Sequence, residues 1–305
     1  MKVAGQIPEG EPFLPHPGIA VGVAPQVAVS FKQCRSALNR SGIPGMDYCL
    51  NPYSGCAHGC LYCYASFMRR FLNVEQRWGS FVQVKNNFPE RLAAELRRPK
   101  HGRVMLASVT DAYQPVEKRF GLTRSCLELL TRSELEVGIL TKSDLVVRDL
   151  DLLARLPNVR VGFTLTVADD GLARLLEPGA PPPSRRLAAM AALARAGVRT
   201  WAFIAPVIPG LGDTAENLGS LLRAAKAAGA REVHFDPLNF YPTAVANLER
   251  VFSRHFPRRL GAWHAACRNP AAYRKRLARV IAELYSTFGS PIGRGDKTPP
   301  RYPCP

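Results

Sequence analysis

Three cysteines lie close together in the segment NPYSGCAHGCLYCYA, which spans residues 51–65. Thiolates are soft ligands, and three of them in one loop suit a soft metal ion or an iron–sulfur cluster. A four-iron cluster that is bound only by Cys56, Cys60 and Cys63 keeps one iron open for a small ligand. The spacing therefore predicts a metal centre with one open position.

The same residues have two other interpretations. A structural zinc site needs a fourth ligand, usually from a second C-x-x-C or a histidine pair, and no such motif follows. His58 lies inside the loop, which makes it a poor fourth ligand for zinc. A thioredoxin-like redox pair of Cys60 and Cys63 would leave Cys56 unexplained. The remaining cysteines show no ligand grouping, so we expect no second cluster; they are Cys34, Cys49, Cys126, Cys267 and Cys304.

Short apolar runs alternate with helical patterns through the middle of the chain. The runs cover 103–110, 135–142, 159–166, 198–207 and 232–238, and a first strand is expected near 46–50. Near-continuous apolar runs of this length are typical of strands that are buried on both faces. Helices are expected at 122–130, 146–156, 184–196 and 213–228, with Ser184 as an N-cap and Asp213 with Glu216 as a capping box.

Repeated strand–helix units of this kind predict a parallel sheet with crossover helices. About six units fit the chain, and periodicity alone leaves open a doubly wound sheet or a full or partial barrel. We expect three regions: an irregular N-terminal arm at 1–46, a core at 47–241 and a helical C-terminal extension at 242–305, with helices at 244–254 and 271–288.

Composition and charge narrow the class of protein. Hydrophobic residues make up 47% of the 305 residues, which is enough for a sizeable core. No apolar run approaches the roughly 20 residues that span a bilayer, and residues 1–10 lack the apolar segment of a secretory signal. We therefore expect a cytoplasmic protein with reduced thiols and no membrane partner.

Positive charge is concentrated towards the C-terminus. The whole chain carries a net charge of +17, and residues 250–305 contain 12 Lys and Arg against Glu283 and Asp296. Such a surface attracts polyanions, which makes a nucleic acid a candidate partner. An alternative explanation of the overall charge is a GC-rich gene, because GC-rich codons favour arginine.

The cysteine spacing carries a family resemblance. C-x-x-x-C-x-x-C with an aromatic residue before the last cysteine, in a loop after the first strand of a strand–helix repeat, resembles the radical S-adenosylmethionine (SAM) superfamily. The longer string looks like the spore photoproduct lyase-related, DNA repair photolyase-like branch. Further matches follow in the order of that branch over about 47–241: TKS at 141–143, EP at 177–178, PSRRL at 183–187 and PVIPGLGD at 206–213.

The resemblance implies a fold and a chemistry. The fold is an α/β, partial (β/α)6 TIM-type barrel with one 4Fe–4S cluster at the C-terminal mouth of its strands. S-adenosylmethionine chelates the open iron, and one electron from a reductant such as flavodoxin or ferredoxin cleaves it. The resulting 5′-deoxyadenosyl radical abstracts hydrogen from a substrate. The substrate itself stays open between a nucleic acid, a peptide and a small metabolite, and a zinc-stabilised nucleic-acid-binding module without catalysis is the non-enzymatic alternative.

The resemblance also implies roles for single residues. Tyr62 would lie beside the adenine, and Lys142 would contact the carboxylate of S-adenosylmethionine, as a matching lysine does in the lyases. Arg186 has two interpretations, a similar carboxylate contact or an ordinary surface arginine. Thr110 and Asp111 would hold the methionine amino group or form a simple turn. Backbone and apolar walls of the adenine pocket would come from Pro206, Val207 and Ile208.

Hydrogen donation is where this sequence departs from the lyases. Tyr64 matches a lyase tyrosine that is proposed to relay hydrogen, with packing as its other interpretation. The lyases carry a donor cysteine just after the second strand, and residues 106–111 contain none. Cys126 is expected on a buried helix face, and Cys304 is a terminal thiol that would have to reach the mouth. We therefore expect the reaction on spore photoproduct to fail or to stop at a trapped product.

Overall fold

Six parallel strands form the main sheet of the computed structural model, which describes residues 27–288. They pair in chain order, and β2 (Asn39–Arg40) adds an antiparallel strand beside the first of them. A parallel sheet whose strands never reverse their order winds in one direction, as a barrel does and a doubly wound sheet does not. The two outer strands do not pair with each other, so the barrel is open and the expected partial barrel is confirmed. The six strands are β3 (Tyr48–Leu50), β6 (Arg103–Leu106), β7 (Glu136–Thr141), β8 (Arg160–Leu165), β9 (Arg199–Val207) and β10 (Glu232–Pro237).

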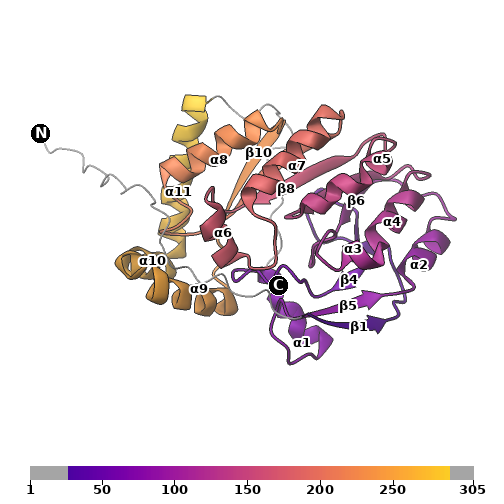
Figure 1. Cartoon of the computed structure of the whole chain (residues 1–305), viewed down its shortest axis with the longest axis horizontal. Coiled ribbons are helices and arrows are strands. Elements are labelled where there is room, and N and C mark those ends of the chain that lie inside the picture. Colours follow the sequence, from indigo (N-terminus) through magenta and orange to yellow (C-terminus); the bar gives the residue numbers. More distant parts are fainter. Residues whose placement is uncertain (1–26, 289–305) are drawn as a thin grey trace, which may run out of the picture.

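Helices follow the strands and cover the outside of the sheet (Figure 1). Most of their apolar faces bury one continuous core with the strands, in which Val104, Ile139 and Phe163 are fully buried. The covering segments are α2 (Phe88–Glu95), α3 (Glu117–Phe120), α4 (Leu122–Leu130), α5 (Leu150–Leu153), α6 (Asp170–Leu176), α7 (Pro183–Arg195) and α8 (Ala215–Ala227).

Helix starts differ from the sequence-based expectations in three places. Residues 146–156 begin as a 3-10 helix, η2 (Asp144–Asp149), before the single turn of α5. Pro182 is the N-cap residue of α7, so Ser184 lies inside the first turn and bonds Asp170 instead. Helix α8 is capped by Thr214, whose side chain accepts from the backbone N–H of Asn217. The expected capping box of Asp213 and Glu216 is not formed, because the N-cap lies one residue later, at Thr214, which is three residues before Asn217.

The described part of the N-terminal arm is not irregular. Strand β1 (Ala28–Lys32) pairs in parallel with β5 (Phe81–Lys85), which pairs with the short antiparallel strand β4 (Tyr53–Ser54) to form a second sheet. The expectation of an irregular arm is therefore wrong for 28–32 and 39–40. Every residue of β1 is exposed, so its sequence carries no burial pattern that would mark a strand. Residues 1–26 lie outside the described part, and the division into three regions stays a prediction.

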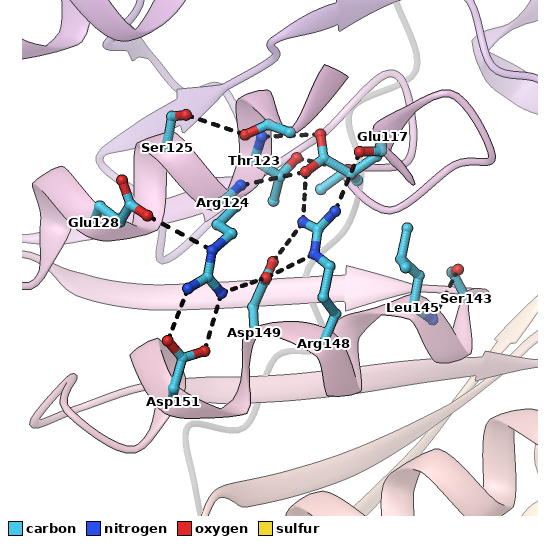
Figure 2. A network of polar contacts seen from close by, with 12 residues as sticks. Glu117, Thr123, Arg124, Ser125, Glu128, Ser143, Leu145, Arg148, Asp149 and Asp151 are labelled. Carbon is cyan, nitrogen blue, oxygen red and sulfur yellow. Dashed lines mark hydrogen bonds and ion pairs between the residues drawn. The ribbon is translucent and has the colours of Figure 1, made fainter. Parts of the chain in front are cut away.

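A cluster of charged side chains fixes the helices behind β6 and β7 (Figure 2). Glu117 is fully buried and accepts from Arg148 at 2.7 Å and from the backbone N–H of Thr123 at 3.0 Å. Asp149 is also fully buried and receives both Arg148 and Arg124, at 2.8 and 3.0 Å. Buried carboxylates are tolerated when they are paired and hydrogen-bonded in this way. The cluster ties α3 and α4 to η2.

Three helices after the barrel close its last strands. They are α9 (Pro242–His255), α10 (Leu260–Arg268) and α11 (Pro270–Phe288), with the 3-10 turn η3 (Pro257–Arg259) between the first two. Trp263 of α10 is fully buried and stacks on Phe252 with ring centroids 4.9 Å apart. Tyr273 and Tyr285 donate to the backbone oxygens of Val207 and Val233, both at 3.0 Å. Within residues 27–288, no helix has the length and apolarity to cross a membrane.

Candidate cofactor site

Glycines allow the cysteine loop to pack closely against β5 and against the residues just before it. Gly55 has φ +85°, and a Cβ atom there would lie 2.5 Å from the backbone oxygen of Phe81. Gly79, with φ +99°, approaches Gly59 so closely that its Cβ would lie 2.6 Å from the Gly59 Cα. No real Cβ tolerates such contacts, so both positions need glycine. The loop thereby reaches the carboxyl ends of the parallel strands.

All three cysteines of the loop line one cavity at that end of the barrel. Each of them is a free thiol. No group of three or more His, Cys, Asp or Glu residues between 27 and 288 could hold a single metal ion. Three soft thiol donors around one cavity fit a larger cysteine-bound group, such as an iron–sulfur cluster. Other residues lining the cavity include His58, Tyr62, Tyr64, Trp78, Ser108, Lys142, Phe203, Asp236 and Asn239.

The thiols of the loop are protonated in the protein alone. Burial raises the pKa of Cys60 to about 12, although the nearby Lys142 works in the opposite direction. The pKa of Cys56 is also raised, by burial and then by the carboxylate of Asp111. A metal group that binds here must therefore displace protons, which couples its binding to pH.

Lys142 follows β7 and places its ammonium group beside the loop. Its Nζ lies 5.6 Å from the centre of the Tyr62 ring, and it lines the same cavity. Burial alone would lower the pKa of Lys142, but its interactions with Cys60 and with the carboxylate of Glu177 outweigh burial and raise the pKa above its usual value. The site thus contains a half-buried, charged cation next to the cysteines.

The carboxylate of Glu177 is the common partner of the polar groups around Tyr62. Thr166 donates to its carboxylate at 2.7 Å, Tyr62 donates through its hydroxyl, and Arg186 forms an ion pair with it. Burial opposes ionisation of Glu177, yet Arg186 and Lys142 lower its pKa to about 2. All of these polar groups are satisfied by one another, which fixes the Tyr62 ring.

Arg186 does not reach the cavity. It is 0% exposed, so the surface interpretation is wrong, and its guanidinium donates to the backbone oxygens of Pro181 and Thr164 at 2.7 and 3.0 Å. It acts on the site through Glu177. The carboxylate contact expected for Arg186 therefore has no geometric support here.

Thr110 and Asp111 line the cavity, but their side chains are committed to the surrounding loops. Thr110 donates to the backbone oxygen of Gly55 at 2.6 Å. Asp111 accepts from Thr141 at 2.7 Å and from the backbone N–H of Lys142 at 2.9 Å, and it lies 3.4 Å from Nδ1 of His58. Burial would raise the pKa of Asp111, but His58 and these hydrogen bonds lower it to about 2. The pair locks the cysteine loop to the ends of β6 and β7.

The other predicted residues divide between the cavity and the core. Pro206 lines the cavity, whereas Val207 and Ile208 are fully buried in apolar clusters. Tyr64 lines it too, and its hydroxyl donates to the backbone oxygen of Ser108.

No cysteine occupies the segment after β6, where Ala107, Ser108 and Val109 line the cavity. Cys126 is 1% exposed within the main core, and Cys304 lies outside the described residues.

Several lining residues were missed in the sequence, among them Asp236 and Trp78. Asp236 on β10 sits where the register with β9 shifts, and burial raises its pKa to about 6 although Arg274 lowers it. A carboxylate inside an otherwise apolar run was the signal that could have found it. Trp78 comes from the loop after α1 (Met68–Leu72), and no spacing pattern connects it to the cysteines.

Comparisons with known proteins agree with this geometry. The sequence model of the radical SAM superfamily matches residues 50–225. A protein of Methanocaldococcus jannaschii is 34% identical over 253 residues, which cover 82% of this chain and 90% of the relative. A radical SAM Nα-GlyT isomerase of Pseudomonas phage M6 is 27% identical over 79% of this chain, which spans about half (51%) of the phage enzyme. The structure of spore photoproduct lyase in complex with a dinucleoside spore photoproduct has a similar fold, with a TM-score of 0.57 and 20% identity over 74% of this chain and 66% of the lyase.

Proposed function

Because this chain belongs to the radical SAM superfamily, we propose that it binds one 4Fe–4S cluster through Cys56, Cys60 and Cys63 and cleaves S-adenosylmethionine. When bound, the cluster would supply the electron for a reductive cleavage that yields a 5′-deoxyadenosyl radical, which abstracts hydrogen from a substrate. The observation that carries the proposal is the convergence of three free thiols on one cavity beside a half-buried lysine.

The chain's own residues supply charge and shape. Lys142 offers a half-buried ammonium group to a carboxylate, and charge-assisted hydrogen bonds of this kind are stronger than neutral ones. Glu177 and Arg186 hold the ring of Tyr62 at the cavity wall, where it can contact a flat ring. Apolar lining by Trp78, Phe203 and Leu238 keeps solvent from a reactive species.

Anaerobic reconstitution tests the proposal directly. Purified protein should contain about four irons per chain, by the stoichiometry of the cluster. After chemical reduction it should release 5′-deoxyadenosine from S-adenosylmethionine, even without substrate. Tightly bound zinc without iron, in protein that has never met oxygen, would contradict the proposal and favour the zinc-stabilised module.

Replacing Lys142 by methionine should weaken the binding of S-adenosylmethionine while the iron content stays unchanged. The substitution keeps much of the side-chain volume and removes the only lysine or arginine that lines the described cavity. A hydrogen bond to a charged group contributes about 1.5–3 kcal/mol, so we expect affinity to fall roughly 10- to 150-fold. Equilibrium binding to reconstituted protein measures it.

The matched control is Lys118→Met, which removes an exposed lysine on α3 and should leave affinity as it was. Wild-type affinity in Lys142→Met would place that lysine outside the binding site.

We further propose a nucleic acid as the substrate class, with a flavodoxin- or ferredoxin-like reductant. The charge of the last helices supports the nucleic acid. Residues 250–288 carry nine Lys and Arg against one Glu, and Arg254, Arg258 and Lys275 are all exposed. Arginine and lysine on helices that adjoin the barrel can neutralise phosphates without reading bases. A peptide or a small metabolite is the alternative substrate.

Binding of a single-stranded oligonucleotide should therefore weaken steeply with salt. Each phosphate contact contributes a slope of about −0.7 to the log–log plot for single strands. The triple variant Arg254→Ala, Arg258→Ala and Lys275→Ala should make the slope shallower by about 2. Fluorescence anisotropy between low and moderate salt measures both.

A second triple variant, of the exposed Arg91, Arg97 and Arg98 on and after α2, is the matched loss of charge and should keep the wild-type slope. Equal slopes in all three proteins would leave the C-terminal helices as a structural cap and favour a peptide or metabolite.

A further inference from the structure

An aromatic row runs from the cavity to the protein surface along the segment that follows the cysteine loop. Tyr64 lines the cavity, Phe67 lies one helical turn further and Phe71 ends the row on α1. The ring centroids of Tyr64 and Phe67 are 6.5 Å apart, and those of Phe67 and Phe71 are 5.9 Å apart at 87°. The spacing of three and four residues places these rings on one side of the helical segment.

The outer end of this row is unusually exposed. Phe71 is 74% exposed, against 61% for Phe31 and 37% for Val29, the other exposed large hydrophobic residues of the described part. In Figure 1, α1 lies at the periphery of the molecule, beyond β1 and β5. A phenylalanine left in water forgoes the stabilisation of burial, so folding does not explain Phe71. A single exposed ring needs no explanation, but a row that continues into a candidate active site does.

Positive charge flanks the row. Arg70 precedes Phe71 in α1, and Arg77 follows in the loop that returns to β5; both side chains are exposed. Arg69 is bound locally, because its guanidinium donates to the backbone oxygen of Glu75 at 2.6 Å. The segment 64–78 thus contains three arginines and one acidic residue, Glu75. Exposed aromatic faces beside arginines are the arrangement that binds unstacked bases and their phosphates.

We propose that this aromatic row, Tyr64, Phe67 and Phe71 with Arg70 and Arg77, is a docking surface for single-stranded nucleic acid next to the cavity. Its outer ring stacks on an unpaired base, its arginines neutralise the adjoining phosphates, and the strand continues towards the cysteine loop. The inference rests on the proposed nucleic-acid substrate and names the surface that presents it. A peptide partner is disfavoured because the row offers ring faces and cations rather than an apolar groove.

The test is oligonucleotide binding by the reconstituted full-length chain. A fluorescent single-stranded DNA 12-mer and the RNA of the same sequence should both bind at low salt. Phe71→Ala should weaken binding between about 5- and 150-fold, the range for loss of one base–aromatic stack. Phe71→Trp should restore it, because it returns a stacking ring. Arg70→Ala should reduce the salt slope by about 0.7.

Two substitutions serve as matched controls. Phe31→Ala removes the other exposed phenylalanine, which packs edge-on against Phe120 and does not line the cavity. Arg98→Ala removes an exposed arginine after α2. Both should bind like the wild type. Circular dichroism of every variant checks that the fold is intact.

Several results would overturn the proposal. These are no oligonucleotide binding at low salt, wild-type affinity in Phe71→Ala, or an equal loss in Phe31→Ala. A dimer that dissociates in Phe71→Ala, seen by light scattering, would assign the surface to protein contacts instead. Failure of the proposed chemistry is seen separately, because 5′-deoxyadenosine release without substrate does not depend on oligonucleotide binding.

Discussion

Replacing Cys60 by alanine should abolish both the iron–sulfur cluster and the cleavage of S-adenosylmethionine. The three thiols of the loop line one cavity, and no other described cysteine lines it to replace the lost sulfur. Two remaining thiolates hold a four-iron group poorly, so iron should fall from about four per chain to below one. The 5′-deoxyadenosine produced under reducing conditions should drop to the level of a sample without protein.

The matched control is Cys267→Ala, which removes a free, half-buried cysteine on α10 that does not line the cavity. It should keep both iron and activity. Iron content and mass-spectrometric detection of 5′-deoxyadenosine decide the outcome together. A Cys60→Ala protein that retains four irons and cleaves S-adenosylmethionine would show that the loop is not the ligand set.

Replacing Arg186 by methionine should destabilise the fold by about 3–5 kcal/mol, the usual cost of breaking a buried ion pair by removing one partner. Arg186 and Glu177 are both buried, and loss of the guanidinium leaves the carboxylate with a much weaker set of partners. Urea unfolding of the metal-free protein measures the loss. Arg185→Met is the matched control, because Arg185 precedes Arg186 in the sequence but pairs with Asp144 at the surface, where its side chain is 63% exposed. Such exposed pairs contribute about 1 kcal/mol or less.

The same pair gives stability a defined pH dependence. Glu177 ionises with a pKa of about 2 in the folded protein, below its ordinary value of 4.5. A depressed carboxyl pKa stabilises the fold fully above the unfolded value, and the contribution is lost as pH falls from there through the folded value. The wild type should therefore lose stability between about pH 4.5 and 2, whereas Arg186→Met should show a smaller loss over that range. If the wild type and Arg186→Met lost the same stability over this pH range, the low pKa of Glu177 would not depend on Arg186.

The apolar runs predicted the parallel strands, because strands that are buried on both faces form near-continuous apolar runs, and the family resemblance implied the partial barrel. The sequence located the cysteine loop because its three cysteines lie within eight residues of one another in the chain. Pairing between β1 and β5 was not predictable in this way, since the partners are about fifty residues apart and β1 is wholly exposed. Helix α10 was missed because its nine residues hold one large apolar anchor, Trp263.

The roles of single residues could not be predicted where their partners are distant in the chain or belong to another element. Arg186 has no local pattern that separates a buried arginine from a surface one, because the decisive partner, Glu177, belongs to a different helix–loop junction. The string EP at 177–178 matches the family pattern without implying a role, and the structure makes Glu177 the acceptor for the hydroxyl of Tyr62. Asp236 was hidden inside an apolar run. Side-chain placement depends on tertiary contacts that spacing does not encode.

The contact between Asn247 and Leu61 has a consequence for modularity. Asn247 of α9 donates to the backbone oxygen of Leu61 at 2.9 Å, between the second and third cysteines of the loop. The superfamily model ends at residue 225, well before this helix. The cysteine loop is therefore braced by a part of the chain that lies outside the residues matched by the superfamily model. Transplanting the barrel alone into another protein would leave that brace behind, so the smallest portable form of this site includes α9.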